Sequence, residues 1–325
     1  MTDALVVTSS FLPGRGGIES YLSALCDAVA PRLAVMARAR RDGVRLPDDL
    51  GYPTIGGPGP MVWPSRALVD AVETACGRLG TDRVIFGTPW PLVLIGPRLA
   101  ARGLRYSVIV HGAEIVMPAA VPGLDRALAA ALGGAELLLP VSRYTGEKLE
   151  SFLSEKANRV PPIRVLRALV DTERFSPDAD VEAARRWLGV SPEAKVVLYF
   201  GRLVERKGVH NAIRAMPAIR DRVPDARLVV AGTGPQLGRL RRLAESLHVP
   251  AIFTGRVPQE LAAGVYAAAD VFTLPVTDRW FGYEIEGLGV VLLEAAAAGT
   301  ACVTGRSGGT PEAVVDGVTG FVVDA

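Results

Sequence analysis

The feature that most constrains the fold of this chain is a regular alternation of short β-rich runs with helical patterns, which fills the first half and then starts again. Such alternation is typical of parallel sheets whose strands are joined by helices. The expected strands are 4–7, 33–36, 83–86, 106–110 and 136–140 in the first half, and 195–200, 226–232, 251–255, 270–275 and 301–305 in the second.

A proline-bearing segment, 159–180, interrupts the alternation and is the expected linker. With 325 residues, the chain is long enough for two domains that each bury a core. We therefore expect an α/β protein with two Rossmann-like, doubly wound domains, residues 1–165 and 166–325. Because ligands of such sheets bind at the carboxyl ends of the strands, the two domains are expected to open toward a shared cleft.

The overall composition, with 49% hydrophobic and 22% charged residues, is that of a globular protein. The N-terminus lacks the basic region of a signal peptide, and no apolar run approaches the ~18 residues of a membrane span. The three cysteines are scattered and have no CxxC spacing, which argues against a disulfide framework and against a zinc site. The sequence indicates a cytoplasmic protein.

The N-terminal half carries a small excess of basic residues, with a cluster at 38–41 and Arg45 close by. This cluster is either a solvated loop or a surface that meets an anionic membrane or substrate. No basic stripe with interleaved aromatic residues is present, so nucleic-acid binding is disfavoured.

Two motifs of the first half follow expected strands. The glycines of PGRGGIES, among them Gly16 and Gly17, form either an ordinary tight turn or a loop that lets a ligand approach a helix N-terminus. Their spacing matches neither the dinucleotide nor the Walker pattern, which disfavours a dehydrogenase. His111, at the end of strand 106–110, is either a structural residue or a side chain directed at the cleft.

In the second half, strand 195–200 ends in GRLVERKG, in which Arg202 and Lys207 bracket a short loop before a helix. Two fixed cations beside a helix N-terminus have the outline of a diphosphate site, although exposed surface charges would explain the same residues.

The stretch EGLGVVLLEAAAAG places Glu294 among apolar residues at helical spacing, which predicts a buried helix. A buried carboxylate costs several kcal/mol unless something hydrogen-bonds it, and the adjacent hydroxyls of a ribose could do so. Ahead of this helix, Glu286 precedes Gly287, Leu288 and Gly289, whose backbone could cradle phosphate while Glu286 meets a sugar.

Taken together and in order, these motifs resemble the retaining glycosyltransferases of family 4, which have the glycosyltransferase-B fold. The similarity is strongest to the phosphatidylinositol mannoside mannosyltransferases of actinobacteria, notably in GGIESYL and EGLGVVLLEAAAAG. The matching segments extend over nearly the whole chain: GGI at 16–18, HGAE at 111–114, VDTERFSP at 170–177, GRLVERKG at 201–208, the pair Glu286 and Glu294, and SGGTPE at 307–312.

The resemblance implies a role for each matching residue. Arg202 and Lys207 would neutralise the donor diphosphate, Glu294 would hold the ribose hydroxyls, Glu286 would contact the donor sugar, and His111 would touch the sugar near its reacting face. In addition, Gly16 and Gly17 would let the first domain close on the phosphates, and the backbone around Arg256 and Val257 would meet the base.

The implied reaction is the retaining, metal-independent transfer of a hexose, with mannose favoured, from a nucleotide diphosphate sugar to a hydroxyl of a glycolipid or small-molecule acceptor. GDP-mannose is favoured over a UDP-sugar, the nucleotide sugar is a substrate, and no cofactor is expected. Peripheral contact with the cytoplasmic face of an anionic membrane fits the basic N-terminal half. The Asp178–Asp180 pattern is expected to be a helix cap and not a metal site.

Three other functions stay open on the same fold: a UDP-sugar-dependent transferase acting on a small molecule or polysaccharide, a sugar-nucleotide 2-epimerase, and a non-catalytic sugar-nucleotide-binding subunit.

The chain also departs from the family pattern in three places. Residues 167–169 replace a Pro-x-Gly turn, the chain ends at GFVVDA where relatives continue through further helices, and the loop 278–285 is unusually aromatic. Trp280, Phe281 and Tyr283 of that loop either stack on a sugar or lipid or pack the loop itself.

Overall fold

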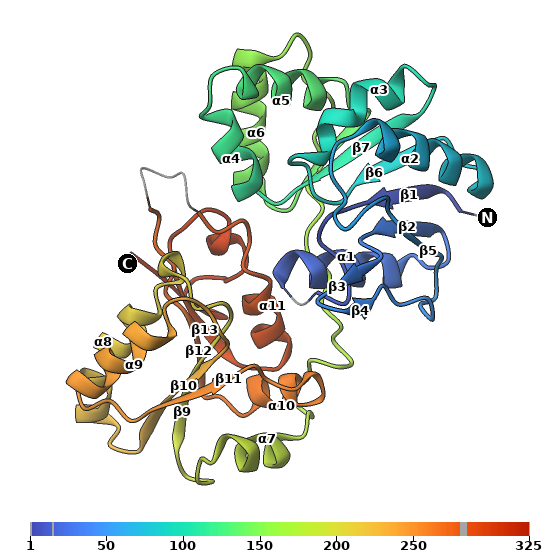
Figure 1. The fold of residues 1–325 in the computed structure, drawn as a ribbon. Helices are drawn as coiled ribbons and strands as arrows, with labels where there is room; N and C mark the ends of the chain where they lie inside the picture. Colours follow the sequence, from blue (N-terminus) through green and yellow to red (C-terminus); the bar gives the residue numbers. More distant parts are fainter. Residues whose placement is uncertain (1, 15, 280–284, 325) are drawn as a thin grey trace. The chain divides into compact units, whose positions relative to one another are not determined.

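The computed structural model describes residues 2–14, 16–279 and 285–324 (Figure 1). The chain divides into two compact units, Met1–Leu169 and Val170–Ala325. Trp280, Phe281 and Tyr283 lie outside the described residues. No helix in the described ranges is both long enough and apolar enough to cross a membrane.

The first unit is built on a sheet that, among the described residues, has six parallel strands in the order β5-β2-β1-β6-β7-β8. These strands are β1 (Ala4–Val7), β2 (Leu33–Ala37), β5 (Thr54–Gly56), β6 (Arg83–Phe86), β7 (Arg105–Val110) and β8 (Leu137–Pro140). Every residue of β1 and β2 is buried, as expected for strands covered on both faces. A small antiparallel hairpin pairs β3 (Arg40–Arg41) with β4 (Val44–Arg45).

The helices of the first unit connect these strands (Figure 1). They are α1 (Gly17–Ala28), α2 (Arg66–Leu79), α3 (Gly96–Ala100), α4 (Ala113–Ala119), α5 (Leu124–Gly133) and α6 (Arg143–Lys156), with a 3₁₀ turn η1 at Leu92–Ile95. Serine side chains define two of the helix starts, because Ser65 accepts a hydrogen bond from the Leu68 amide and Ser142 accepts one from the Thr145 amide.

The second unit repeats the arrangement, with six parallel strands in the described part of the chain ordered β11-β10-β9-β12-β13-β14. The strands are β9 (Lys195–Phe200), β10 (Ala226–Ala231), β11 (Ala251–Gly255), β12 (Val271–Leu274), β13 (Ala301–Gly305) and β14 (Gly320–Val323). The helices are α7 (Val181–Leu188), α8 (Val209–Arg222), α9 (Leu237–Ser246), α10 (Ala262–Ala267) and α11 (Val290–Ala297), with 3₁₀ turns η2 (Glu205–Lys207), η3 (Gln259–Leu261) and η5 (Thr310–Glu312).

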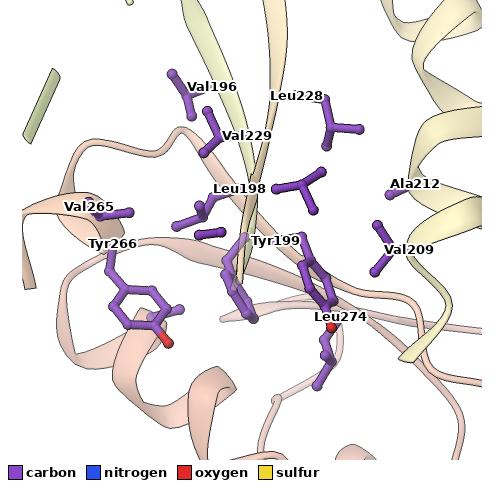
Figure 2. Close-up of a cluster of buried hydrophobic side chains, with 14 of the residues drawn as sticks. Val196, Leu198, Tyr199, Val209, Ala212, Leu228, Val229, Val265, Tyr266 and Leu274 are labelled. Carbon is purple, nitrogen blue, oxygen red and sulfur yellow. The ribbon is translucent and has the colours of Figure 1, made fainter. Parts of the chain in front are cut away.

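Asp180 is a helix cap, as predicted, because its side chain accepts a hydrogen bond from the Ala183 amide at 2.8 Å. The core of the second unit packs around two buried tyrosines, Tyr199 of β9 and Tyr266 of α10, which lie among aliphatic side chains of the sheet (Figure 2). The Tyr266 ring stacks on Phe200 with centroids 5.0 Å apart.

Both sheets confirm the prediction of doubly wound domains. Along each sheet, three strands follow one another in one direction and the remaining three continue on the other side of the first strand. The strand order therefore reverses between β1 and β6 in the first unit and between β9 and β12 in the second. Ligands of open α/β sheets bind at such switch points, outside the carboxyl ends of the strands. The predicted domain boundary follows residue 165, and the first unit of the structure ends shortly after it, at Leu169.

Candidate functional site

A cluster of three charged side chains occupies the switch point of the second unit. Arg206 and Lys207 belong to η2, which follows β9, and Glu286 lies in the segment between β12 and α11. Lys207 Nζ is 2.8 Å from Glu286 Oε2, and the Arg206 guanidinium pairs with the same carboxylate oxygen. The side chains of Lys207 and Glu286 are each 13% exposed, and that of Arg206 is 23% exposed. We call Arg206, Lys207 and Glu286 the switch-point triad.

The backbone of η2 is held against the chain that leaves β12. The Thr277 amide donates to the Arg206 carbonyl oxygen at 3.0 Å. Gly208, directly after the triad cations, has φ +69°, and a Cβ placed on it would lie 1.6 Å from the Pro275 carbonyl oxygen. Only glycine fits there, because the position needs both the left-handed conformation and the absence of a side chain.

Glu286 is held in turn by the loop that follows β13. The Gly309 amide donates to the Glu286 carbonyl oxygen at 2.9 Å. A Cβ on Gly308, which has φ +54°, would lie 2.0 Å from the same carbonyl oxygen. The buried Thr310 hydroxyl donates to the Gly305 carbonyl oxygen at 2.7 Å and closes this loop. The SGGTPE motif is therefore a backbone support for Glu286.

The triad keeps Glu286 ionised. Burial raises the pKa of this carboxyl, but the nearby charges of Lys207 and Arg206 outweigh burial and hold the pKa below its usual value. The pKa of Tyr199 is raised above its usual value. Burial is the main cause and the charge of Glu286 adds to it, while the charges of Arg206 and Arg202 oppose the shift only in part.

Arg202, predicted to bind the donor diphosphate together with Lys207, does not belong to the switch-point triad. Its side chain is exposed and, among the described residues, has no ion-pair partner. Its carbonyl oxygen accepts a hydrogen bond of 2.7 Å from the Tyr199 hydroxyl, which fixes the start of the loop. The structure thus brings together Lys207 and Glu286, both selected from the sequence, with Arg206, which the sequence reasoning missed. The only signal for Arg206 was its position next to Lys207 in the same turn.

Glu294 lies on α11 and is half-buried. Its Oε2 accepts a hydrogen bond of 2.7 Å from the Tyr266 hydroxyl, whereas its Oε1 has no hydrogen-bond partner within the ranges that the structure describes. Burial raises the pKa of Glu294, although Tyr266 and the charge of Arg174 oppose that shift. One oxygen is therefore fixed by the protein, and the other is left to accept a hydrogen bond from a hydroxyl group.

The segment between Glu286 and Glu294 ends in a helix N-terminus. Gly289 caps α11 with φ +80°, and Leu288 is buried. The first amides of a helix have no partner within the helix and attract anions. At the end of β11, Arg256 is exposed and Val257 is buried in the core of the second unit.

The switch point of the first unit is polar and contains the predicted glycines. Gly16 caps α1 in an extended conformation, and Gly17 is the first residue of that helix. Glu19, buried in the first turn of α1, pairs with Arg41 Nη1 at 2.8 Å. This pair lies against the glycine loop, because a Cβ on Gly14 would meet the Arg41 guanidinium. Arg41 is therefore tied to the loop and is not simply a solvated member of the basic cluster.

His111 follows β7 at the same edge of the first sheet. Its Nε2 lies 2.8 Å from the Gly87 carbonyl oxygen, so Nε2 carries the proton that it donates there. Its ring meets the buried Tyr21 ring edge-on, with centroids 5.2 Å apart. These contacts fix the orientation of the imidazole. Within the described residues, no group of three or more His, Cys, Asp or Glu side chains is placed to hold a metal ion.

The chain matches known proteins along nearly its whole length. The profile of the family described as "Glycosyl transferases group 1" matches residues 180–325. The GDP-mannose-dependent α-(1-6)-phosphatidylinositol monomannoside mannosyltransferase of Mycolicibacterium smegmatis is 37% identical over 98% of this chain and 85% of that protein. A GDP-mannose-dependent monoacylated α-(1-6)-phosphatidylinositol monomannoside mannosyltransferase of Corynebacterium glutamicum is 32% identical over 98% of this chain and 84% of that protein.

Solved structures share the fold. HepE of Anabaena, in complex with UDP and glucose, matches with a TM-score of 0.76 and 20% identity over 100% of this chain and 86% of HepE. Sucrose-phosphate synthase of Thermosynechococcus elongatus matches with a TM-score of 0.75 and 21% identity over 99% of this chain and 86% of that protein. The expected glycosyltransferase-B fold is thereby confirmed. The resemblance inferred from the sequence motifs is confirmed as well, and the chain belongs to the group 1 glycosyl transferases and is a glycosyltransferase.

Proposed function

We propose that this glycosyltransferase transfers mannose from GDP-mannose to a hydroxyl group of a phosphatidylinositol mannoside, with retention of the anomeric configuration and without a metal ion. The observation that carries the proposal is the switch-point triad, which holds two cations around one carboxylate at the ligand edge of the second sheet. The names of the relatives at 32% to 37% identity support the donor and the acceptor.

Each half of the chain has a proposed part in this reaction. Residues 166–325 bind the donor: Lys207 and Arg202 neutralise the diphosphate and stabilise the leaving group, and Glu286 contacts the sugar. Residues 1–165 form the acceptor side, where His111 meets the sugar near its reacting carbon and Gly16 and Gly17 let the backbone approach the phosphates. Positive charge already fixed at the site lowers the energy of a leaving diphosphate without reorganisation. No step then requires a metal ion.

Glu294 is proposed to recognise the ribose of the donor. Its free Oε1 would accept a hydrogen bond from a ribose hydroxyl, while Tyr266 keeps the other oxygen in place. Arg256 and Val257 would present their backbone to the guanine.

The donor proposal is tested by thermal unfolding with GDP, UDP, ADP or dTDP at millimolar concentration in the presence of EDTA. A ligand at about 100 times its dissociation constant stabilises the folded state by about 2.7 kcal/mol. We expect GDP to raise the unfolding temperature of the wild-type chain most, and Glu294→Ala to lose most of that increase because the ribose loses its acceptor.

A matched control is Glu245→Ala, which removes an exposed carboxylate from α9 and should leave the GDP effect unchanged. Stabilisation by UDP in place of GDP would instead favour the UDP-sugar transferase, and stabilisation that requires Mg²⁺ would contradict metal independence. Mannose release or epimerisation without transfer, measured with GDP-mannose and a phosphatidylinositol mannoside acceptor, would contradict the transferase reaction.

We further propose that the first unit meets an anionic membrane at the cytoplasmic face. Arg40 and Arg45 lie opposite each other in the β3–β4 hairpin, and the exposed Val44 precedes Arg45. Arg38 extends this surface to the exposed Met61, whose sulfur lies 3.4 Å from Arg38 Nη2, and the exposed Trp63 follows. Basic residues beside exposed aromatic and aliphatic side chains suit a lipid headgroup surface, at about 1 kcal/mol per cation.

Sedimentation with phosphatidylglycerol vesicles tests this surface. We expect Arg40→Gln combined with Arg45→Gln to weaken binding about tenfold or more, because two charges worth about 1 kcal/mol each are lost. Arg222→Gln, which removes an exposed charge from the second unit, is the control and should bind as the wild type does. Equal binding of the double variant and the wild type would contradict the proposed surface.

A further inference from the structure

In the switch-point triad, Lys207 has Glu286 as an ion-pair partner. Its ammonium lies 2.8 Å from Glu286 Oε2, and both side chains are largely buried. The proposed function assigns this same ammonium to the donor diphosphate. The diphosphate must therefore compete with Glu286 for Lys207, and the competition would be costly if Glu286 were then left buried and unpaired.

Arg206 supplies a second counter-ion for that carboxylate. Its guanidinium pairs with the oxygen that Lys207 also contacts, and its backbone is anchored by the hydrogen bond from the Thr277 amide. On the other side, Gly308 and Gly309 hold the backbone of Glu286. The Arg206–Glu286 pair can thus stay assembled when the Lys207 side chain turns away.

We propose that Arg206 is a positioning residue that keeps Glu286 compensated and in place while Lys207 passes from Glu286 to the donor diphosphate. This inference rests on the proposed function, because it needs a diphosphate as ligand. It makes the triad an ion-pair exchange: Glu286 has Lys207 and Arg206 as counter-ions, and keeps Arg206 as a counter-ion once Lys207 binds the diphosphate.

The charges of the triad predict how each substitution acts. Two cations and one carboxylate give a net charge of +1. Arg206→Gln lowers that charge to 0 and leaves Lys207 as the remaining triad counter-ion of Glu286, so the diphosphate should bind more weakly. Glu286→Gln raises the charge to +2 and releases Lys207, so the diphosphate should bind more tightly although turnover is lost. The double variant returns the charge to +1 and should bind like the wild type.

The experiment is calorimetric titration of GDP into the wild-type chain, Arg206→Gln, Arg206→Lys, Glu286→Gln and the double variant. At low ionic strength we expect Arg206→Gln to weaken and Glu286→Gln to strengthen GDP binding by about tenfold each, the scale of one charge near a protein surface. Arg206→Lys should bind nearly as the wild type does. All differences should shrink in high salt, which a purely structural role of Arg206 would not cause.

Steady-state kinetics with GDP-mannose give a second readout. Arg206→Gln should raise KM for the donor and also lower kcat, because Glu286 is no longer held against the sugar, and Arg206→Lys should restore most of both. The matched control is Arg239→Gln, since Arg239 pairs with Glu205 of the same turn at 2.8 Å but is 60% exposed. That variant should keep wild-type affinity and turnover.

Two results would overturn the exchange: GDP affinity of Arg206→Gln equal to that of the wild type, or a double variant that binds no better than Arg206→Gln. If Arg206→Gln does not fold, as judged by its thermal unfolding, the tighter binding of Glu286→Gln still decides, because an unchanged or weaker affinity there contradicts the competition for Lys207. Failure of the proposed function looks different, since the wild type itself would then bind no nucleoside diphosphate.

Discussion

Lys207→Ala should reduce kcat/KM for mannose transfer by about 10²- to 10³-fold, the scale seen when a preorganised charge that stabilises a developing anion is removed. The Lys207 side chain is 13% exposed and its ammonium lies 2.8 Å from Glu286 Oε2, so little water can replace the lost charge. Most of the loss should appear in kcat, because the leaving diphosphate gains charge only as the sugar departs. The measurement is initial-rate kinetics with GDP-mannose and a phosphatidylinositol mannoside acceptor.

The matched control is Lys195→Ala, which removes a lysine from the opposite end of β9. Lys195 pairs with Asp270 at 3.0 Å and its side chain is 61% exposed, so its loss should change stability by less than about 1 kcal/mol and leave turnover intact. Unchanged turnover in Lys207→Ala, with Lys195→Ala also active, would remove Lys207 from the proposed mechanism.

The central strands could be predicted from the sequence because they are apolar runs bounded by turn residues. All ten expected strands occur, including β9 and β13, whose predicted and observed bounds agree. The edge strands β5 and β14 were missed. β5 has only three residues, which lie between a proline and a glycine. β14 does contain a short apolar run, 321–323, but this run was not interpreted as a strand.

The candidate site could be predicted in part, because single residues at strand ends can be recognised but their partners cannot. Lys207 and Glu286 were selected for separate roles, and the structure joins them in one ion pair across 79 positions of the chain. The hydrogen bond between Tyr266 and Glu294 likewise depends on how α10 packs against α11. Such pairs are set by tertiary packing, which a local pattern does not contain.

The other large effect is expected on stability, from Gly208→Ala. Gly208 has φ +69°, and a Cβ there would lie 1.6 Å from the Pro275 carbonyl oxygen, so the backbone of η2 must move away from β12 to admit a methyl group. We expect the free energy of unfolding of the second unit to fall by about 3 kcal/mol or more, the range of substitutions that force strain or overlap. Urea unfolding followed by circular dichroism measures it.

Gly189→Ala separates the two causes of that loss. Gly189 ends α7 with φ +68°, nearly the conformation of Gly208, but a Cβ there would meet no atom within 4 Å. It should therefore cost only about 1 kcal/mol, the price of a left-handed conformation without overlap. Equal losses of unfolding free energy in the two variants would mean that η2 can move away from β12 without further cost. A much larger loss in Gly208→Ala, joined by weaker GDP binding in the fraction that still folds, would mean that contact with β12 sets the position of Lys207.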